Sequence, residues 1–159
     1  MGLVVGDQAP EFTLKQKTGE GLVDVSLGSY LGEKHVVVLF FPLAYTDICR
    51  DEMCSVSEGI SAYEALDAQV LGISVDSPFS QEAWAKSNDI SIPLLSDFNK
   101  EVSANYGAQF EDLLGFKGVA KRSAFVIDKE GIVRFVSVSD DPTVLPDFVA
   151  IKNCLESLD

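Results

Sequence analysis

An almost unbroken apolar run from residue 35 to residue 41 (HVVVLFF) is the feature that most constrains how this sequence can fold. The run is rich in β-branched and aromatic side chains, and it lacks the alternation of a strand that has one face in water. It therefore predicts a strand that is buried on both faces, inside a sheet. Pro42 ends this strand, because its nitrogen has no hydrogen to donate to a neighbouring strand.

The residues after Pro42 predict a helix that has a cysteine in its first turn. Apolar side chains recur with helical spacing over residues 49–66, and Thr46 or Asp47 can cap the helix N-terminus. The free N–H groups and the dipole at such a terminus stabilise an anion, and thiols placed there have pKa values of roughly 3.5–7.5 instead of about 8.5. Cys49 is therefore a candidate thiolate nucleophile, and the alternative is a small buried core residue.

Strands and helices alternate along the chain, which predicts an α/β fold. No internal repeat, low-complexity tract or linker interrupts the pattern, so we expect one domain over residues 1–159. Crossovers through helices imply parallel strands, whereas the turn at residues 129–131 implies an antiparallel hairpin, so the sheet should be mixed. The expected elements are a hairpin of residues 11–14 and 22–26, a short helix at 27–31, strands at 35–41, 69–75, 122–128 and 131–138, and helices at 49–66, 79–87, 99–106 and 146–158.

The composition argues against several classes of partner. The 159 residues carry a formal net charge of −13, and the 12 basic residues are scattered, which disfavours binding to nucleic acid or to an anionic membrane surface. The N-terminus lacks the pattern of an export signal, and no apolar run approaches the ~18 residues of a membrane-spanning helix. Three cysteines do not form the dense framework of a secreted disulfide-bonded domain. We therefore expect a cytoplasmic protein.

The segment Pro42-x-x-x-Thr46-x-x-Cys49 resembles the active-site signature of the peroxiredoxins, which are thiol peroxidases of thioredoxin fold. This resemblance implies a thioredoxin-like fold, with helices on both faces of a mixed central sheet and an N-terminal β-hairpin. Four further segments resemble the same family in the same order along the chain: Gly6-Asp7-x-Ala9-Pro10-x-Phe12, Ile73-Ser74-Val75-Asp76-Ser77, Leu94-Leu95-Ser96-Asp97 and Arg122-x-x-Phe125-x-Ile127-Asp128.

The resemblance also implies a reaction. The Cys49 thiolate would attack a peroxide O–O bond to form cysteine sulfenic acid, with no metal and no organic cofactor. Arg122, on a neighbouring strand, would hold the thiolate and polarise the peroxide, although periodicity alone does not separate it from Lys121. Thr46 would donate its hydroxyl to the thiolate or peroxide, with a helix cap as its other role. Pro42 would shape the pocket and shield the thiolate from water.

Two further residues are expected to support the site. Glu52 matches the acidic residue of the longer family pattern, and we expect it to interact with Arg122 or to act as an acid in the first helical turn. Tyr45 is expected near the pocket or at a subunit contact. The family includes monomers and dimers, so the protein should be a monomer or a homodimer.

Cys54 follows Cys49 after four residues, a spacing that resembles the bacterioferritin-comigratory, or Q-type, peroxiredoxins. The resemblance implies that Cys54 condenses with the Cys49 sulfenic acid to an intramolecular disulfide, which thioredoxin or a similar thiol reductant recycles. In an ideal helix the two Cα atoms would lie about 8.6 Å apart, whereas a disulfide usually needs them within about 7 Å. The first turns of the helix must therefore unwind before the bond can close.

Two alternatives remain open for Cys54. It can pack in the core, and the segment Tyr45–Cys49 also resembles the one-cysteine, mycobacterial-type branch, in which an external thiol resolves the sulfenic acid. Cys154, in the last expected helix, lacks the sequence surroundings of a C-terminal resolving cysteine and is expected to be structural.

Other function classes remain as alternatives. A non-enzymatic redox-sensing interaction protein could use the same Cys49 to change shape and bind a partner. A thioredoxin-like disulfide exchanger would use a Cys-x-x-Cys pair, and the four residues between Cys49 and Cys54 argue against it. A zinc site built from three cysteines and His35 would have an uncommon ligand spacing.

Overall fold

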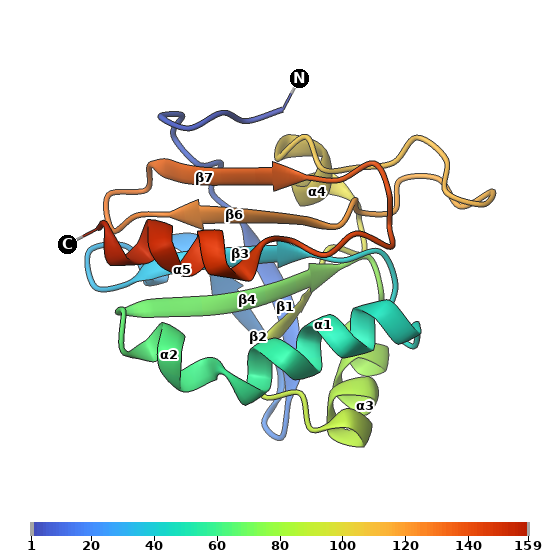
Figure 1. Cartoon of the computed structure of the whole chain (residues 1–159). Helices are drawn as coiled ribbons and strands as arrows, with labels where there is room; N and C mark the ends of the chain where they lie inside the picture. The colour runs from blue at the N-terminus through green and yellow to red at the C-terminus, as the bar shows by residue number, and fades with distance from the viewer. Residues whose placement is uncertain (1, 159) are drawn as a thin grey trace.

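A computed structural model describes residues 2–158 of the chain. Its strands are β1 Thr13–Thr18, β2 Gly21–Ser26, β3 His35–Phe40, β4 Ala68–Ser74, β5 Leu94–Ser96, β6 Ser123–Ile127 and β7 Val133–Val138. Its helices are η1 Leu27–Ser29 (a 3-10 helix), α1 Asp47–Glu58, α2 Ile60–Glu64, α3 Pro78–Asn88, α4 Glu101–Asn105 and α5 Phe148–Glu156. These strands form one sheet in the order β2-β1-β5-β4-β3-β6-β7 (Figure 1).

The sheet is mixed, as the sequence predicts. β3, β4 and β5 are parallel to one another, because helices connect them. The remaining neighbours are antiparallel, including the N-terminal hairpin of β1 and β2 and the pair formed by β3 and β6. The expected α/β class, mixed sheet and N-terminal hairpin are therefore confirmed.

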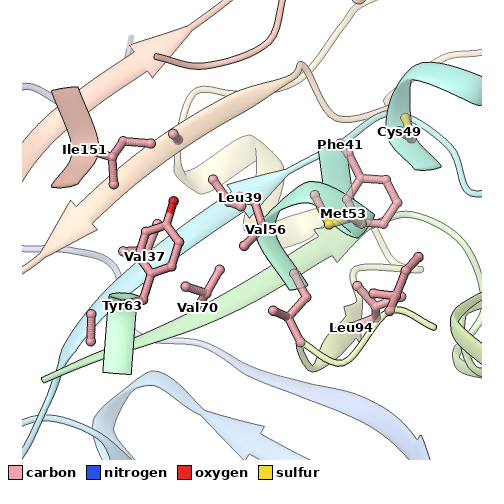
Figure 2. Packing of buried hydrophobic residues seen from close by; sticks show 14 of the residues in the cluster. Val37, Leu39, Phe41, Cys49, Met53, Val56, Tyr63, Val70, Leu94 and Ile151 are labelled. Carbon is pink, nitrogen blue, oxygen red and sulfur yellow. The ribbon is translucent and has the colours of Figure 1, made fainter. Parts of the chain in front are cut away.

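β3 lies near the middle of the sheet, and all six of its residues are buried. Its side chains enter two apolar clusters in alternation, one on each face of the sheet, because successive residues of a strand point in opposite directions. The first cluster packs against α1, α2, α3 and α5; Figure 2 shows Val37 and Leu39 of β3 beside Met53, Val56 and Tyr63. The second cluster contains side chains of α4, of the N-terminal segment and of the alternate β3 residues, Val36, Val38 and Phe40.

The helix expected over residues 49–66 is in fact two helices, because Gly59 separates α1 from α2. The backbone N–H of Gly59 donates to the carbonyl of Ser55 at 3.2 Å and closes the last turn of α1. Glycine has a low helix propensity, so a break in the helix costs less free energy at Gly59 than at its neighbours. Apolar spacing continues through Val56 and Tyr63 on either side, which is why periodicity predicted one helix.

Two other element boundaries follow from side-chain caps. The last helix begins after Asp147, because the Asp147 carboxylate accepts the backbone N–H of Ala150 at 3.0 Å. β7 begins later than expected because Asp128 Oδ1 accepts two backbone N–H groups of the preceding turn, those of Glu130 and Ile132. Among residues 2–158, no helix combines the length and the apolar character needed to cross a membrane.

Candidate active site

Cys49 lies at the end of the sheet where β3 gives way to α1. It is the third residue of α1, and its side chain is 1% exposed. Figure 2 shows the sulfur beside Phe41, with Met53 one turn further along the helix. The thiol is therefore placed in the first helical turn, as the sequence predicts, and it is sealed from bulk water.

Arg122 contacts the sulfur of Cys49 directly. Its Nη2 group donates to Cys49 Sγ at 3.1 Å, and the Arg122 side chain is 2% exposed. The position follows from sheet register, because Ser123, the first residue of β6, pairs with Phe40 at the end of β3. Arg122, just before β6, therefore lies at the same sheet end as Cys49. The adjacent Lys121 points elsewhere, toward Asp140 at 2.6 Å.

The other two sides of the Arg122 guanidinium are also occupied. Nη1 donates to Glu52 Oε1 at 2.7 Å, and Nε donates to the backbone carbonyl of Pro142 at 2.8 Å. Arg122 thus has one contact on each of its three nitrogens, and only one of these contacts is to the thiol. Pro142, in the connection between β7 and α5, carried no sequence signal, because a backbone carbonyl is common to every residue.

Glu52 is fully buried in the same helix as Cys49. Burial raises the pKa of its carboxyl to about 7, because desolvation disfavours the charged form more than the neighbouring Arg122 favours it. Its second oxygen, Oε2, has no hydrogen-bond partner within residues 2–158. The acid expected to interact with Arg122 is therefore in contact with it, in a setting where its own charge is poorly solvated.

Thr46 is the N-cap residue of α1, but its side chain makes no cap hydrogen bond with the helix. The hydroxyl instead donates to the carbonyl of Leu43 at 2.8 Å, within the loop that connects β3 to α1. Thr46 is exposed, whereas Pro42 at the start of the loop is buried. Both residues lie in the segment that leads into the helix turn of Cys49, and the Thr46 hydroxyl bonds to Leu43 instead of the thiol. Its expected contact with a peroxide stays a prediction.

The loop is held in shape by Asp76, which was not singled out as a site residue. Its Oδ2 accepts the backbone N–H of Ala44 at 2.7 Å and the hydroxyl of Ser74 at 2.7 Å. Tyr45 adopts a positive φ of 65°, an uncommon conformation for a residue with a bulky side chain. Its exposed ring packs in a tilted arrangement against Trp84, with the ring centroids 6.4 Å apart. An acid just after β4, beside the strand that leads to Cys49, was the signal that could have identified Asp76.

Cys54 does not face Cys49. Its thiol donates to the backbone carbonyl of Asn88, at the end of α3, with a distance of 3.3 Å. Burial raises the pKa of this thiol. Cys154 lies on α5, with its sulfur 3.7 Å from the carbonyl of Arg134, and burial raises the pKa of its thiol as well. All three cysteines are free thiols.

Comparison with known proteins places this arrangement in a family. The profile of the AhpC/TSA family matches residues 5–136. A chloroplastic 2-Cys peroxiredoxin BAS1 of Spinacia oleracea is 35% identical over 144 residues, which cover 86% of this chain and 53% of that protein. The chain thus spans about half the length of this relative. A putative peroxiredoxin in the rubredoxin operon of Clostridium pasteurianum is 38% identical over 149 residues, which cover 88% of this chain and 81% of that one.

Solved structures agree with these relatives. A peroxiredoxin-like protein from Aquifex aeolicus superposes with a TM-score of 0.88 at 28% identity, covering 100% of this chain and 90% of that one. The peroxidoxin BcpB of Mycobacterium tuberculosis superposes with a TM-score of 0.79 at 30% identity, covering 96% of this chain and 94% of that one. The thioredoxin-like layer arrangement expected from the sequence is therefore confirmed.

Proposed function

The chain belongs to the AhpC/TSA family of peroxiredoxins, and on that premise we propose that it is a thiol-dependent peroxidase whose nucleophile is Cys49. Its substrates would be hydrogen peroxide and organic hydroperoxides. The observation that carries the proposal is the 3.1 Å contact between Arg122 Nη2 and Cys49 Sγ, two groups that are both buried. Arg122 is a permanent cation, and this contact places a charged hydrogen-bond donor against the sulfur that would react.

In the proposed reaction the Cys49 thiolate attacks one oxygen of the peroxide. An S–O bond forms, the O–O bond breaks, and the second oxygen leaves with a proton as water or an alcohol, so that the sulfur is oxidised to sulfenic acid. Arg122 is suited to stabilise the negative charge that grows on the departing oxygen. The proposed role of Thr46 requires its hydroxyl to leave the Leu43 carbonyl and turn toward the peroxide.

We propose that Cys54 resolves the sulfenic acid. Its thiol would attack the Cys49 sulfur, forming the disulfide and releasing water, and a dithiol such as thioredoxin would then return two electrons to the disulfide. The two sulfurs have different partners. Cys54 donates to the Asn88 carbonyl, whereas Cys49 accepts from Arg122. Resolution therefore requires α1 to open locally, which costs less than global unfolding.

Rapid mixing with hydrogen peroxide tests the peroxidase assignment. Wild type should consume many equivalents of peroxide when thioredoxin and its reductase are present, and Cys49→Ser should consume none above background. Cys154→Ser is the matched control and should behave as wild type. Slow, stoichiometric oxidation of Cys49 without recycling would instead support the redox-sensing interaction protein.

Mass analysis after one equivalent of peroxide tests the resolving step. Wild type should lose two mass units through an intramolecular disulfide, whereas Cys54→Ser should hold a sulfenic acid. The same adduct in both proteins would make Cys54 a bystander and would favour resolution by an external thiol.

We propose a cytoplasmic protein that is a monomer or a homodimer. Three free thiols suit a reducing compartment such as the cytoplasm. Tyr45 lies in the loop that precedes α1 and is 63% exposed. We propose that Tyr45 lies at the subunit contact if the protein forms a homodimer. Size-exclusion chromatography with light scattering would distinguish a homodimer from a monomer.

A further inference from the structure

The contact between Arg122 and Pro142 ties the active-site cation to a surface turn. Nη2 and Nη1 of Arg122 serve Cys49 and Glu52, and Nε donates to the Pro142 carbonyl at 2.8 Å. Pro142 belongs to the segment that leaves β7 and returns toward α5 at the sheet end where α1 begins (Figure 1). A residue outside both the sheet and α1 therefore fixes one side of the guanidinium.

The conformation of this turn depends on Asp141. Its Oδ1 accepts the backbone N–H of Thr143 at 2.9 Å and the Thr143 hydroxyl at 2.6 Å. Its backbone carbonyl accepts the Ser139 hydroxyl at 2.9 Å and the N–H of Val144 at 3.1 Å. These bonds join residues on both sides of Pro142, so the backbone on either side of the Pro142 carbonyl is held through Asp141.

The same turn is attached to the backbone of Arg122. The N–H of Ser139 donates to the Arg122 carbonyl at 3.0 Å, which extends the pairing of β6 with β7 past the ends of both strands. Arg122 therefore contacts one turn twice, through its backbone carbonyl and through Nε. A long, flexible side chain held at both ends has few other conformations available to it.

We propose that Asp141 is a positioning residue for the peroxidase reaction: it folds the turn Ser139–Val144 so that the Pro142 carbonyl holds Arg122 against Cys49. The proposal rests on the proposed function of Cys49. Asp141 touches neither the sulfur nor the peroxide, and it acts only through Pro142 and Arg122. Without the turn, the guanidinium loses its Nε acceptor and can rotate away from the sulfur.

Positioning and simple electrostatics predict shifts of opposite direction in the ionisation midpoint of Cys49 when Asp141 is replaced. Asp141 is exposed, so loss of its charge alone should at most lower slightly the pH at which the Cys49 thiol ionises. Misplacing Arg122 should have the opposite effect and raise that pH. A variant that removes Asp141 therefore separates positioning from simple electrostatics.

The experiment uses the full chain carrying Cys54→Ser and Cys154→Ser, so that Cys49 is its only thiol. Thiolate absorbance gives the ionisation midpoint, and rapid mixing with hydrogen peroxide gives the rate constant. Asp141→Ala should raise the midpoint and slow the reaction roughly tenfold, because a charged hydrogen-bond donor is displaced from the sulfur. Asp141→Asn retains the Oδ1 acceptor, so it should restore the rate and return the midpoint to the parent value or slightly below it.

Asp140→Ala is the matched control, since it removes an equal charge from the neighbouring position and breaks only an exposed ion pair with Lys121. It should not raise the midpoint.

Equal values for Asp141→Ala and Asp140→Ala, or a lowered midpoint in Asp141→Ala, would overturn the proposal. If Asp141→Ala does not fold by circular dichroism, Thr143→Val removes one of the same hydrogen bonds and should shift the midpoint in the same direction; an unchanged midpoint there also overturns the proposal. A parent protein that is itself inert toward peroxide would instead refute the proposed function.

Discussion

The carboxylate of Glu52 lies 2.7 Å from Nη1 of Arg122, and solvent reaches almost none of either side chain. Removing two opposite charges from water is costly, and their attraction offsets that cost only while both partners are present. The pair therefore links the stability of the protein to the cation that contacts Cys49, the proposed nucleophile, so that the charge state of Glu52 should affect both.

The stability of the protein should depend on pH through Glu52. Burial raises the pKa of Glu52 from an ordinary 4.5 to about 7 in the folded protein. Between these values the folded state binds more protons than the unfolded state, so stability falls as pH rises from about 4.5 to about 7. At about 1.4 kcal/mol per pKa unit, the loss is of the order of 3 kcal/mol. Urea unfolding at several pH values should show this fall in wild type and its absence in Glu52→Gln; parallel profiles would contradict the assignment.

Replacing Arg122 should separate stability from catalysis. Arg122→Met leaves Glu52 buried without its counter-charge and should destabilise the protein by about 3–5 kcal/mol at pH 8. It should also slow the reaction with peroxide by about 10²–10³-fold. The double variant Arg122→Met/Glu52→Gln should recover much of the stability and none of the rate. Recovery of the rate in the double variant would show that Arg122 acts on Cys49 only through folding.

Strengthening the C-terminal end of α1 should stabilise the protein and leave both oxidation and resolution unchanged. Gly59 has φ −96° and ψ 14°, and an added Cβ would meet nothing closer than the Ser55 carbonyl oxygen at 3.6 Å. Gly59→Ala should therefore stabilise the protein by about 0.4–1 kcal/mol. If only the first turns of α1 open before Cys54 reaches Cys49, disulfide formation and sulfenic acid formation should both keep their wild-type rates. Quenched-flow mass analysis measures both steps, and a slower disulfide step would show that the opening extends to the C-terminal end of α1.

Asp76 should matter although it touches no reacting atom. Asp76→Ala deprives the backbone N–H of Ala44 of its acceptor, which should cost about 1–3 kcal/mol if that group stays buried. The loop that precedes Cys49 should then lose its fixed shape, and the reaction with peroxide should slow. Asp76→Asn keeps an amide oxygen in place and should retain more of the rate, as read by rapid mixing; equal rates for the two variants would contradict this role.

The parts of the site that the sequence predicts are those encoded by local patterns. Cys49 could be assigned to a helical first turn because a buried strand, a proline and an amphipathic helix follow one another directly. Arg122 could be chosen over Lys121 only through family resemblance, because the choice depends on the register of β6 against β3. The contact with Pro142 could not be predicted, because it joins a side chain to a backbone carbonyl 20 residues away.

Local competition explains the remaining differences. The Thr46 hydroxyl has two possible partners, and the sequence does not reveal that the nearby Leu43 carbonyl takes it. The break at Gly59 is hidden by apolar residues that keep helical spacing on both sides. Periodicity reports which face of a helix is buried, and it is insensitive to a single residue at which the backbone changes direction.

The near-complete burial of Cys49 also restricts which molecules can reach its sulfur. Under the proposed function, a small peroxide would approach a sulfur that is enclosed by its own helix turn, whereas a thiol carried by another protein would be too bulky to do so. The reductant would reach the sulfur only after the proposed opening of α1. The fold would then order the two halves of the cycle in time, oxidant first and thiol second, without a separate gate.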